Sequence, residues 1–226
     1  MSEPSVIESS TRQRGRPRVD QKQLAARQRM VVAAAGRLLS ERYMREITVE
    51  QVINEAGISR PTFYRWFPGG TEELFDSMVA EAYSVLARQL AAVISGEGDL
   101  EKRVHAGVGA YFDWCIAQGP VAYAILRDAF NEQSVVYPYR RRTIDFLVDV
   151  ISQQARADGV PDFGPASVET IITWIEGAAI IMLRSFPVPV SLRNQQCLLA
   201  TEMFVALVRK ARDDNFYRDW TGTPRD

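Results

Sequence analysis

The side chains best suited to chemistry in this 226-residue sequence lie between residues 59 and 67. On a helix over this stretch, one side carries two guanidinium groups, a hydroxyl and a phenol, from Arg60, Thr62, Tyr64 and Arg65. These groups suit phosphate oxygens and base edges in the major groove of DNA. The residue types therefore predict nucleic-acid recognition at this surface.

Two short helices are needed to position this surface. Thr48 and Gln51 have the spacing of a capping box that starts the first helix, and Gly57 supplies the left-handed residue that ends it. The apolar positions between them follow one buried face: Val49, Val52, Ile53 and Ala56. Ser59 and Pro61 are typical of the start of a second helix. This order predicts a helix-turn-helix with the second helix as the recognition helix, although an ordinary helical hairpin with a polar face has the same pattern.

The residues after the second helix favour the helix-turn-helix interpretation. Pro68, Gly69 and Gly70 are expected to end it, and Thr71 is predicted to cap a long helix with two carboxylates in its first turn. The segments AGIS (56–59), TFYRWF (62–67) and EEL (72–74) together resemble the signature of the TetR family of transcriptional regulators, over roughly residues 25 to 80. Two positions depart from the family pattern, because Ile53 replaces a small alanine and Thr71 replaces a lysine.

A basic arm precedes the helices. Residues 1–70 contain 12 Lys/Arg and 7 Asp/Glu, whereas residues 71–226 contain 15 and 21, so positive charge is confined to the part predicted to meet DNA. Residues 1–20 are expected to be disordered when free. Their Arg-Gly-Arg-Pro segment resembles the core of an AT-hook, which suits the narrow minor groove, whereas the alternative is a solubilising tail. The expected DNA contacts are Arg14, Arg16, Arg18, Thr48, Ser59, Arg60, Pro61, Thr62, Tyr64, Arg65 and Thr71.

Helical periodicity dominates the whole chain and predicts an all-α fold. A helix from 21 to about 42 would pack on the two short helices, which gives a three-helix DNA-binding domain over 21–70. An apolar stripe predicts a connecting helix over 71–94 that leads into a helical C-terminal domain, 71–226. Further helices are expected over 100–119, from 120, over about 138–158, and over 166–186 and 191–212.

Several classes of protein are disfavoured. The sequence has no run of about 18 apolar residues and no hydrophobic signal core, so we expect a cytoplasmic protein without a membrane partner. Cys115 and Cys197 are expected to be buried free thiols. The single histidine, His105, is expected to be partly buried in the core or a pocket. Because metal-ligand spacing, phosphate loops and nucleophile motifs are missing, we expect no enzyme, no metal and no cofactor.

Aromatic residues on the C-terminal helices are compatible either with an ordinary core or with a pocket for a mostly apolar effector. The candidate effector contacts are Tyr111, Trp114, Tyr123, Arg127, Phe130, Phe146, Trp174 and Glu176. Glu176 lies in the middle of an apolar helix, where an unpaired carboxylate is costly. It needs a partner, which could be an arginine such as Arg127 or Arg184, a group across an interface, or a ligand.

The resemblance implies a function as well as a fold. It implies a homodimer through helices 166–186 and 191–212, and a near-palindromic double-stranded DNA operator. It further implies a repressor released when a small-molecule effector shifts the helix near 72–94. Activation instead of repression is an open alternative, and so is an effector-independent or architectural DNA-binding protein that acts through a protein partner.

Overall fold

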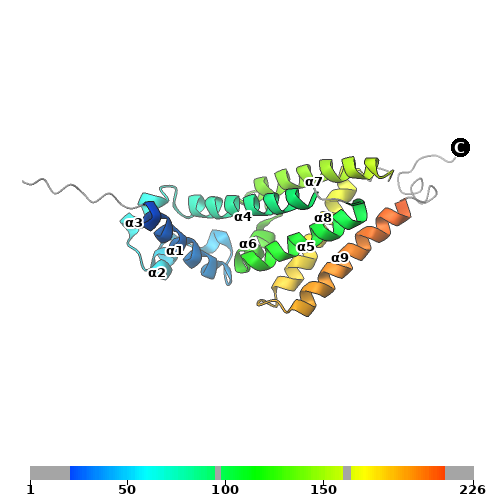
Figure 1. Ribbon diagram of the computed structural model, residues 1–226. Helices are drawn as coiled ribbons and strands as arrows, with labels where there is room; N and C mark the ends of the chain where they lie inside the picture. The colour runs from blue at the N-terminus through cyan, green and yellow to red at the C-terminus, as the bar shows by residue number, and fades with distance from the viewer. Residues whose placement is uncertain (1–20, 95–97, 160–163, 212–226) are drawn as a thin grey trace, which may run out of the picture.

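The computed structural model describes residues 21–94, 98–159 and 164–211, and this part of the chain is helical without a strand (Figure 1). At one end of the molecule lie α1 (Gln21–Leu39), a 3-10 turn (Met44–Glu46), α2 (Val49–Ala56) and α3 (Arg60–Trp66). The long α4 (Gly70–Ile94) leads from this head into a body built from α5 (Leu100–Gln118), α6 (Pro120–Asp128), α7 (Tyr137–Ala157), α8 (Pro165–Leu183) and α9 (Val190–Ala211). The predicted all-α fold is confirmed.

The head is held together by a small apolar core. The side chains that are completely removed from solvent come from all three of its helices and include Val31, Leu39, Val52 and Phe63. The buried Phe63 side chain fixes α3 to this core. Its ring also contacts the Phe67 ring, at a centroid distance of 5.5 Å. Burying an aromatic side chain of this size contributes about 3 kcal/mol, so α3 is fixed on one side and free on the other.

Three helix boundaries differ from the prediction. Helix α1 ends at Leu39 rather than near residue 42, because the Ser40 hydroxyl donates to the Arg37 carbonyl oxygen at 2.6 Å and tighter turns follow. Helix α4 begins at Gly70, so Thr71 lies inside its first turn and does not cap it; the Glu73 carboxylate instead accepts the Gly69 N–H at 2.7 Å. Helix α8 ends at Leu183 rather than Phe186, ahead of Pro187.

Helix α4 connects the head to the body mechanically. Its 25 residues span about 37 Å, and one stripe of them is buried along the whole length, from Leu74 through Val79 to Leu86. It packs against α5 and α7 (Figure 1), and the Tyr139 hydroxyl of α7 donates to the Asp76 carboxylate of α4 at 3.0 Å. Helix α4 is therefore one continuous helix between the end of α3 and the body.

A second contact between head and body is made by Arg127 of α6. Its guanidinium lies 4.4 Å from the ring centre of Tyr43 and 4.9 Å from that of Tyr123, and it donates to the Arg42 carbonyl oxygen at 2.6 Å. It also reaches the Leu39 carbonyl oxygen at the end of α1. Arg127 thus caps the last turn of α1 from the body side.

We expect Arg127→Ala to lower the free energy of unfolding by about 1–3 kcal/mol, because it removes charge-assisted hydrogen bonds and two ring contacts. The matched control is Arg45→Ala, since the Arg45 guanidinium also lies over the Tyr43 ring, at 5.3 Å, and Arg45 is exposed. That control should cost well under 1 kcal/mol. Urea unfolding of both variants at one protein concentration measures the two losses in the free energy of unfolding. Equal losses would contradict a specific stabilising role for Arg127.

The two C-terminal helices leave an apolar face uncovered in the single chain. Ile181 of α8 is 55% exposed and Leu198 of α9 is 57% exposed. The remaining large apolar side chains on this part of the surface are Trp174, Val190, Leu199 and Met203.

By length and composition alone, α8 is apolar enough to cross a membrane, with a mean hydropathy of 1.5 over its most apolar window. It packs against α5, α6, α7 and α9, and it carries a buried carboxylate at Glu176. Helix α8 is therefore packed against other helices on one part of its surface and exposed on another.

Candidate nucleic-acid interface and buried cavity

The turn between α2 and α3 is fixed by its own hydrogen bonds. The Gln51 side chain accepts the Thr48 N–H at 2.9 Å, and the Thr48 hydroxyl oxygen accepts the Gln51 N–H at 3.3 Å, as the predicted capping box requires. Gly57 adopts the left-handed conformation with φ of 64°, and its N–H donates back to α2. A side chain at this position would be strained. The sequence therefore specifies both the start of α2 and the turn into α3.

The outer face of α3 carries the polar side chains predicted to contact DNA. Arg60, Tyr64 and Arg65 are exposed, and Thr62 is half-buried. The Tyr64 ring packs edge-on against the buried Phe63 ring at 5.6 Å, which holds the phenol on the surface. A rigid phenol beside a free guanidinium can donate to phosphates and base edges.

Arg60 is partly occupied by a partner within the head. Its guanidinium donates to the Glu50 carboxylate of α2 at 2.6 Å, and both side chains are more than half exposed. An exposed pair of this kind contributes little to stability, so a phosphate can displace Glu50 at small cost. Arg65 has no such carboxylate among the described residues, which makes it the freer cation on α3.

The other predicted DNA contacts lie around α3. Ser59 precedes the helix without capping it through its side chain, and its hydroxyl instead pairs with that of Thr62 at 2.9 Å. Pro61 is exposed in the first turn, and Thr71 is half-buried in the first turn of α4. Arg14, Arg16 and Arg18 lie outside the described residues, so the structure leaves the minor-groove prediction as it stands.

A cavity of about 140 Å³ lies in the body between α4, α5, α7 and α8. One water molecule occupies roughly 10–15 Å³ of such space, so the cavity has room for an organic molecule. Most of its wall is aliphatic, with Leu86 and Leu90 from α4, Ile144, Leu147 and Ile151 from α7, and Ile171, Ile172 and Ile175 from α8. An apolar ligand would match this wall.

The aromatic part of the wall comes from α4 and α5. The Tyr111 and Trp114 rings stack at 5.8 Å, and the Trp114 indole N–H donates to the Ala82 carbonyl oxygen at 2.9 Å. Burial, aided by the neighbouring Cys115 thiol, raises the pKa of Tyr111 well above its usual range, and burial also raises the pKa of Tyr83. Both phenols therefore stay protonated and can serve as hydrogen-bond donors within the cavity.

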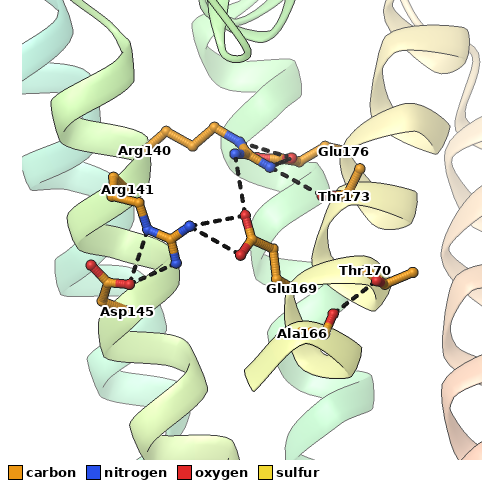
Figure 2. Close-up of polar contacts among 8 residues, drawn as sticks. All are labelled: Arg140, Arg141, Asp145, Ala166, Glu169, Thr170, Thr173 and Glu176. Atoms are coloured by element: carbon orange, nitrogen blue, oxygen red, sulfur yellow. Dashed lines mark hydrogen bonds and ion pairs between the residues drawn. The ribbon is translucent and has the colours of Figure 1, made fainter. Parts of the chain in front are cut away.

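Glu176 is paired with Arg140 of α7, at the edge of this cavity (Figure 2). The Arg140 guanidinium donates to the carboxylate at 2.8 and 3.0 Å and to the Thr173 hydroxyl at 3.1 Å, and the two charged residues are only 5% and 7% exposed. Arg141 continues the network outward, with Glu169 at 3.0 Å and Asp145 at 2.7 Å. The carboxylate is thus satisfied inside the subunit.

The structural ion pair predicted for Glu176 is present, but neither expected arginine supplies it. Arg127 lies on α6 against the head, and Arg184 is exposed directly after α8. The expected partners were wrong because their choice rested on sequence position, whereas α7 crosses α8 at Glu176. Arg140 begins a run of three arginines, a pattern typical of a solvated basic face. The one sequence signal for its burial is the spacing of four residues that puts it on the same helix face as the buried Ile144 and Val148.

The structure brings together only some of the predicted effector contacts. Tyr111, Trp114 and Glu176 line the cavity. Tyr123 and Arg127 instead form the contact with the head, while Phe146 and Trp174 are substantially exposed. Phe130 is exposed beyond the end of α6, with the Arg140 guanidinium 4.3 Å from its ring centre. The cavity residues of α4, including Tyr83, were missed because its apolar stripe is also that of a plain connecting helix.

The two cysteines and the histidine were also considered as functional residues from the sequence. Cys115 and Cys197 are buried free thiols as predicted, and burial raises the pKa of Cys115 far above its usual value, so this thiol stays un-ionised. His105 is exposed on α5, which corrects the expectation that it is partly buried. Within the described residues, no three His, Cys, Asp or Glu side chains form a group that could hold a metal ion.

Parts of this chain are similar in sequence to known proteins. Residues 31–78 match the family described as "Bacterial regulatory proteins, tetR family". The HTH-type transcriptional regulator EthR of Mycobacterium tuberculosis is 33% identical over 105 residues, which are 45% of this chain and 45% of EthR. An uncharacterized HTH-type transcriptional regulator of the same organism is 28% identical over 169 residues, 70% of this chain and 84% of that protein.

A solved structure of a tetR-family transcriptional regulator from Streptomyces coelicolor has a TM-score of 0.57 and 23% identity, over 89% of this chain and 90% of the other. The match to EthR spans less than half of that relative's length. The proteins compared are transcriptional regulators, in agreement with the expectation that this chain is not an enzyme. The chain is therefore similar to the bacterial regulatory proteins of the tetR family, with the match to the family itself lying in residues 31–78.

Proposed function

We propose that this protein is a dimeric, sequence-specific DNA-binding regulator of transcription, and that it represses until a mostly apolar small molecule releases it from DNA. The observation that carries the proposal is the exposed face of α3, where Tyr64 and Arg65 project from a helix anchored by the buried Phe63. The match of residues 31–78 to the tetR family covers this part of the chain, and the similarity to the transcriptional regulator EthR supports a role in transcription. In this proposal, 21–70 form the DNA-binding domain, 71–226 form the effector-binding and dimerisation domain, and the protein acts in the cytoplasm.

Dimerisation would use the uncovered apolar face of α8 and α9. An exposed patch with Ile181, Leu198 and Leu199 is typical of a protein interface. A twofold dimer would place two α3 helices about 34–36 Å apart, one turn of DNA. The operator would then be near-palindromic.

We expect Ile181→Arg combined with Leu198→Arg to convert a dimer to a monomer, because two charges would be buried without partners at the interface. Since both side chains are exposed in the subunit, the monomer itself should stay folded. Phe146→Arg is the matched control, on an exposed apolar residue of α7. Sedimentation equilibrium distinguishes the species, and a dimer that survives the double change would place the interface elsewhere.

Release by an effector would act through α4. Tyr83, Leu86 and Leu90 of α4 line the cavity, and Leu74 of the same helix is buried beside the head. A molecule that fills the cavity can shift α4 only by as much as its affinity differs between the two positions of the helix. Tyr111, Trp114 and Glu176 are the proposed effector contacts among those predicted from sequence.

The function is tested by selecting bound fragments from a random DNA library with the purified protein. We expect enrichment of a near-palindromic site with A·T-rich flanks, and affinity for that site that falls steeply between two salt concentrations. Lack of enrichment would overturn the proposal. Operator binding that no small molecule affects would instead favour an effector-independent DNA-binding protein.

A further inference from the structure

The cavity is elongated and has polar groups at both ends. Its α7 wall runs in one stripe from Arg140 through Ile144, Leu147 and Ile151 to Gln154. Arg140 and Gln154 are 14 positions apart, which corresponds to about 21 Å along the helix axis. The wall between them is apolar except for Thr143. A long apolar body would therefore fit with its two ends near different polar groups.

The two polar ends differ in charge. At the end near the head, Arg140 and Glu176 neutralise each other through direct hydrogen bonds. At the far end lies Arg103 of α5, which donates to the Gln154 side-chain oxygen, and Gln154 in turn donates to Asp158 at 3.1 Å. Gln154 is neutral, so the Arg103 charge has no counter-ion in the cavity wall. Within the described parts of the chain, Arg103 makes no ion pair with a carboxylate.

Arg103 also has an unused donor. Its Nε–H is buried and has no hydrogen-bond partner among the described residues. A buried donor without an acceptor is costly, more so when the donor is charged. The lining thus has one excess positive charge at one end of an apolar cavity, carried by a guanidinium whose buried Nε–H has no acceptor among the described residues.

We propose that the effector is an organic carboxylate with a long apolar body, and that Arg103 binds its carboxylate. This inference rests on the proposed effector role of the cavity. A carboxylate supplies one negative charge and two oxygens that fit a guanidinium. A phosphate monoester carries about −1.5 to −2 and would leave excess negative charge in the apolar wall. The aliphatic residues of α4, α7 and α8 take the body of the ligand, and the Tyr111 hydroxyl is a further donor that lacks an oxygen or nitrogen partner among the described residues.

The test compares ligands that differ only in the end group. Decanoate, decan-1-ol and decylamine are titrated into the full-length protein below their aggregation concentrations, with binding followed by tryptophan fluorescence, because Trp114 lines the cavity. We expect decanoate to bind at least about tenfold more tightly than decan-1-ol, and decylamine to bind most weakly. Arg103→Gln should remove the advantage of decanoate over decan-1-ol, whereas Arg103→Lys should keep part of it.

Lys102→Gln is the matched control, since it removes a positive charge from the neighbouring exposed position on α5 outside the cavity wall. It should leave the preference unchanged. The affinity for decan-1-ol, which has the same apolar body without the charge, shows whether each variant retains the cavity. A variant that is misfolded would lose this affinity as well. Equal affinity of the wild type for decanoate and decan-1-ol, no binding of decanoate, or an unchanged preference in Arg103→Gln would each overturn the inference.

Release of DNA is measured separately on the selected operator. Decanoate that binds through Arg103 but leaves the operator complex intact would refute the coupling in the proposed function and leave the carboxylate site standing. Release of DNA by decan-1-ol with no preference for decanoate would support the function and refute the site. The two failures are therefore distinguishable.

Discussion

Arg140→Met should lower the free energy of unfolding by about 3–5 kcal/mol, because it leaves the Glu176 carboxylate buried without a cation. Glu176 is 7% exposed, and each of its two oxygens accepts a hydrogen bond from Arg140. Urea unfolding at one fixed protein concentration measures the loss, since a dimer's stability depends on concentration.

The matched control for this prediction is Arg141→Met on the same helix. Arg141 also pairs with carboxylates, Glu169 and Asp145, but its side chain is 38% exposed. Its loss should cost about 1 kcal/mol or less. Changing both members of the buried pair, as Arg140→Met with Glu176→Leu, should recover most of the stability, because no charge is then left unpaired. Similar losses in Arg140→Met and Arg141→Met would contradict the buried pair as a stabilising element.

Tyr64→Ala combined with Arg65→Ala should weaken binding to the selected DNA site by at least about a hundredfold. A good base or phosphate contact contributes roughly 1–3 kcal/mol, and this double change removes the freest cation and the fixed phenol of α3. Tyr64→Ala also removes the ring contact with Phe63, so the head should lose about 0.5–1.5 kcal/mol of stability and should remain folded. Fluorescence anisotropy of labelled operator measures the affinity.

Two single changes separate the contributions at α3. Tyr64→Phe keeps the ring that packs on Phe63 and removes only the hydroxyl. Its loss of affinity for the operator therefore measures the contribution of the hydroxyl's hydrogen bond. Arg88→Ala removes an exposed arginine of α4 whose partners among the described residues are Ser84 and Glu81, and this change should leave affinity unchanged. An equal effect of Arg88→Ala and Arg65→Ala would mean that net charge, not the face of α3, determines binding.

The elements around DNA recognition were predictable because their causes are local. The capping box of Thr48 and Gln51 and the left-handed Gly57 each depend on residues a few positions apart, and the structure contains both. The boundaries that differ have local causes as well. Glu73 accepts the Gly69 N–H and so moves the start of α4 ahead of Thr71, although Thr71 is a good capping residue by type.

The cavity was only partly predictable because it depends on how distant helices cross. Sequence identified Glu176 as a carboxylate in need of a partner, since burial alone sets that requirement. The partner, Arg140, lies 36 positions away on another helix, and periodicity within α8 carries no information about it. Aromatic residue type likewise could not separate Trp114, which is buried on the cavity, from Phe146 and Phe130, which are exposed.

The most direct test of the central claim, that the two α3 helices of a dimer read DNA, is a hydroxyl-radical footprint of the full-length protein on the selected operator. We predict two protected segments related by a twofold axis, one helical turn apart on the same face of the duplex, and both lost in the Tyr64→Ala, Arg65→Ala variant. Uniform protection, or the same two segments in the wild type and the variant, would contradict recognition through α3.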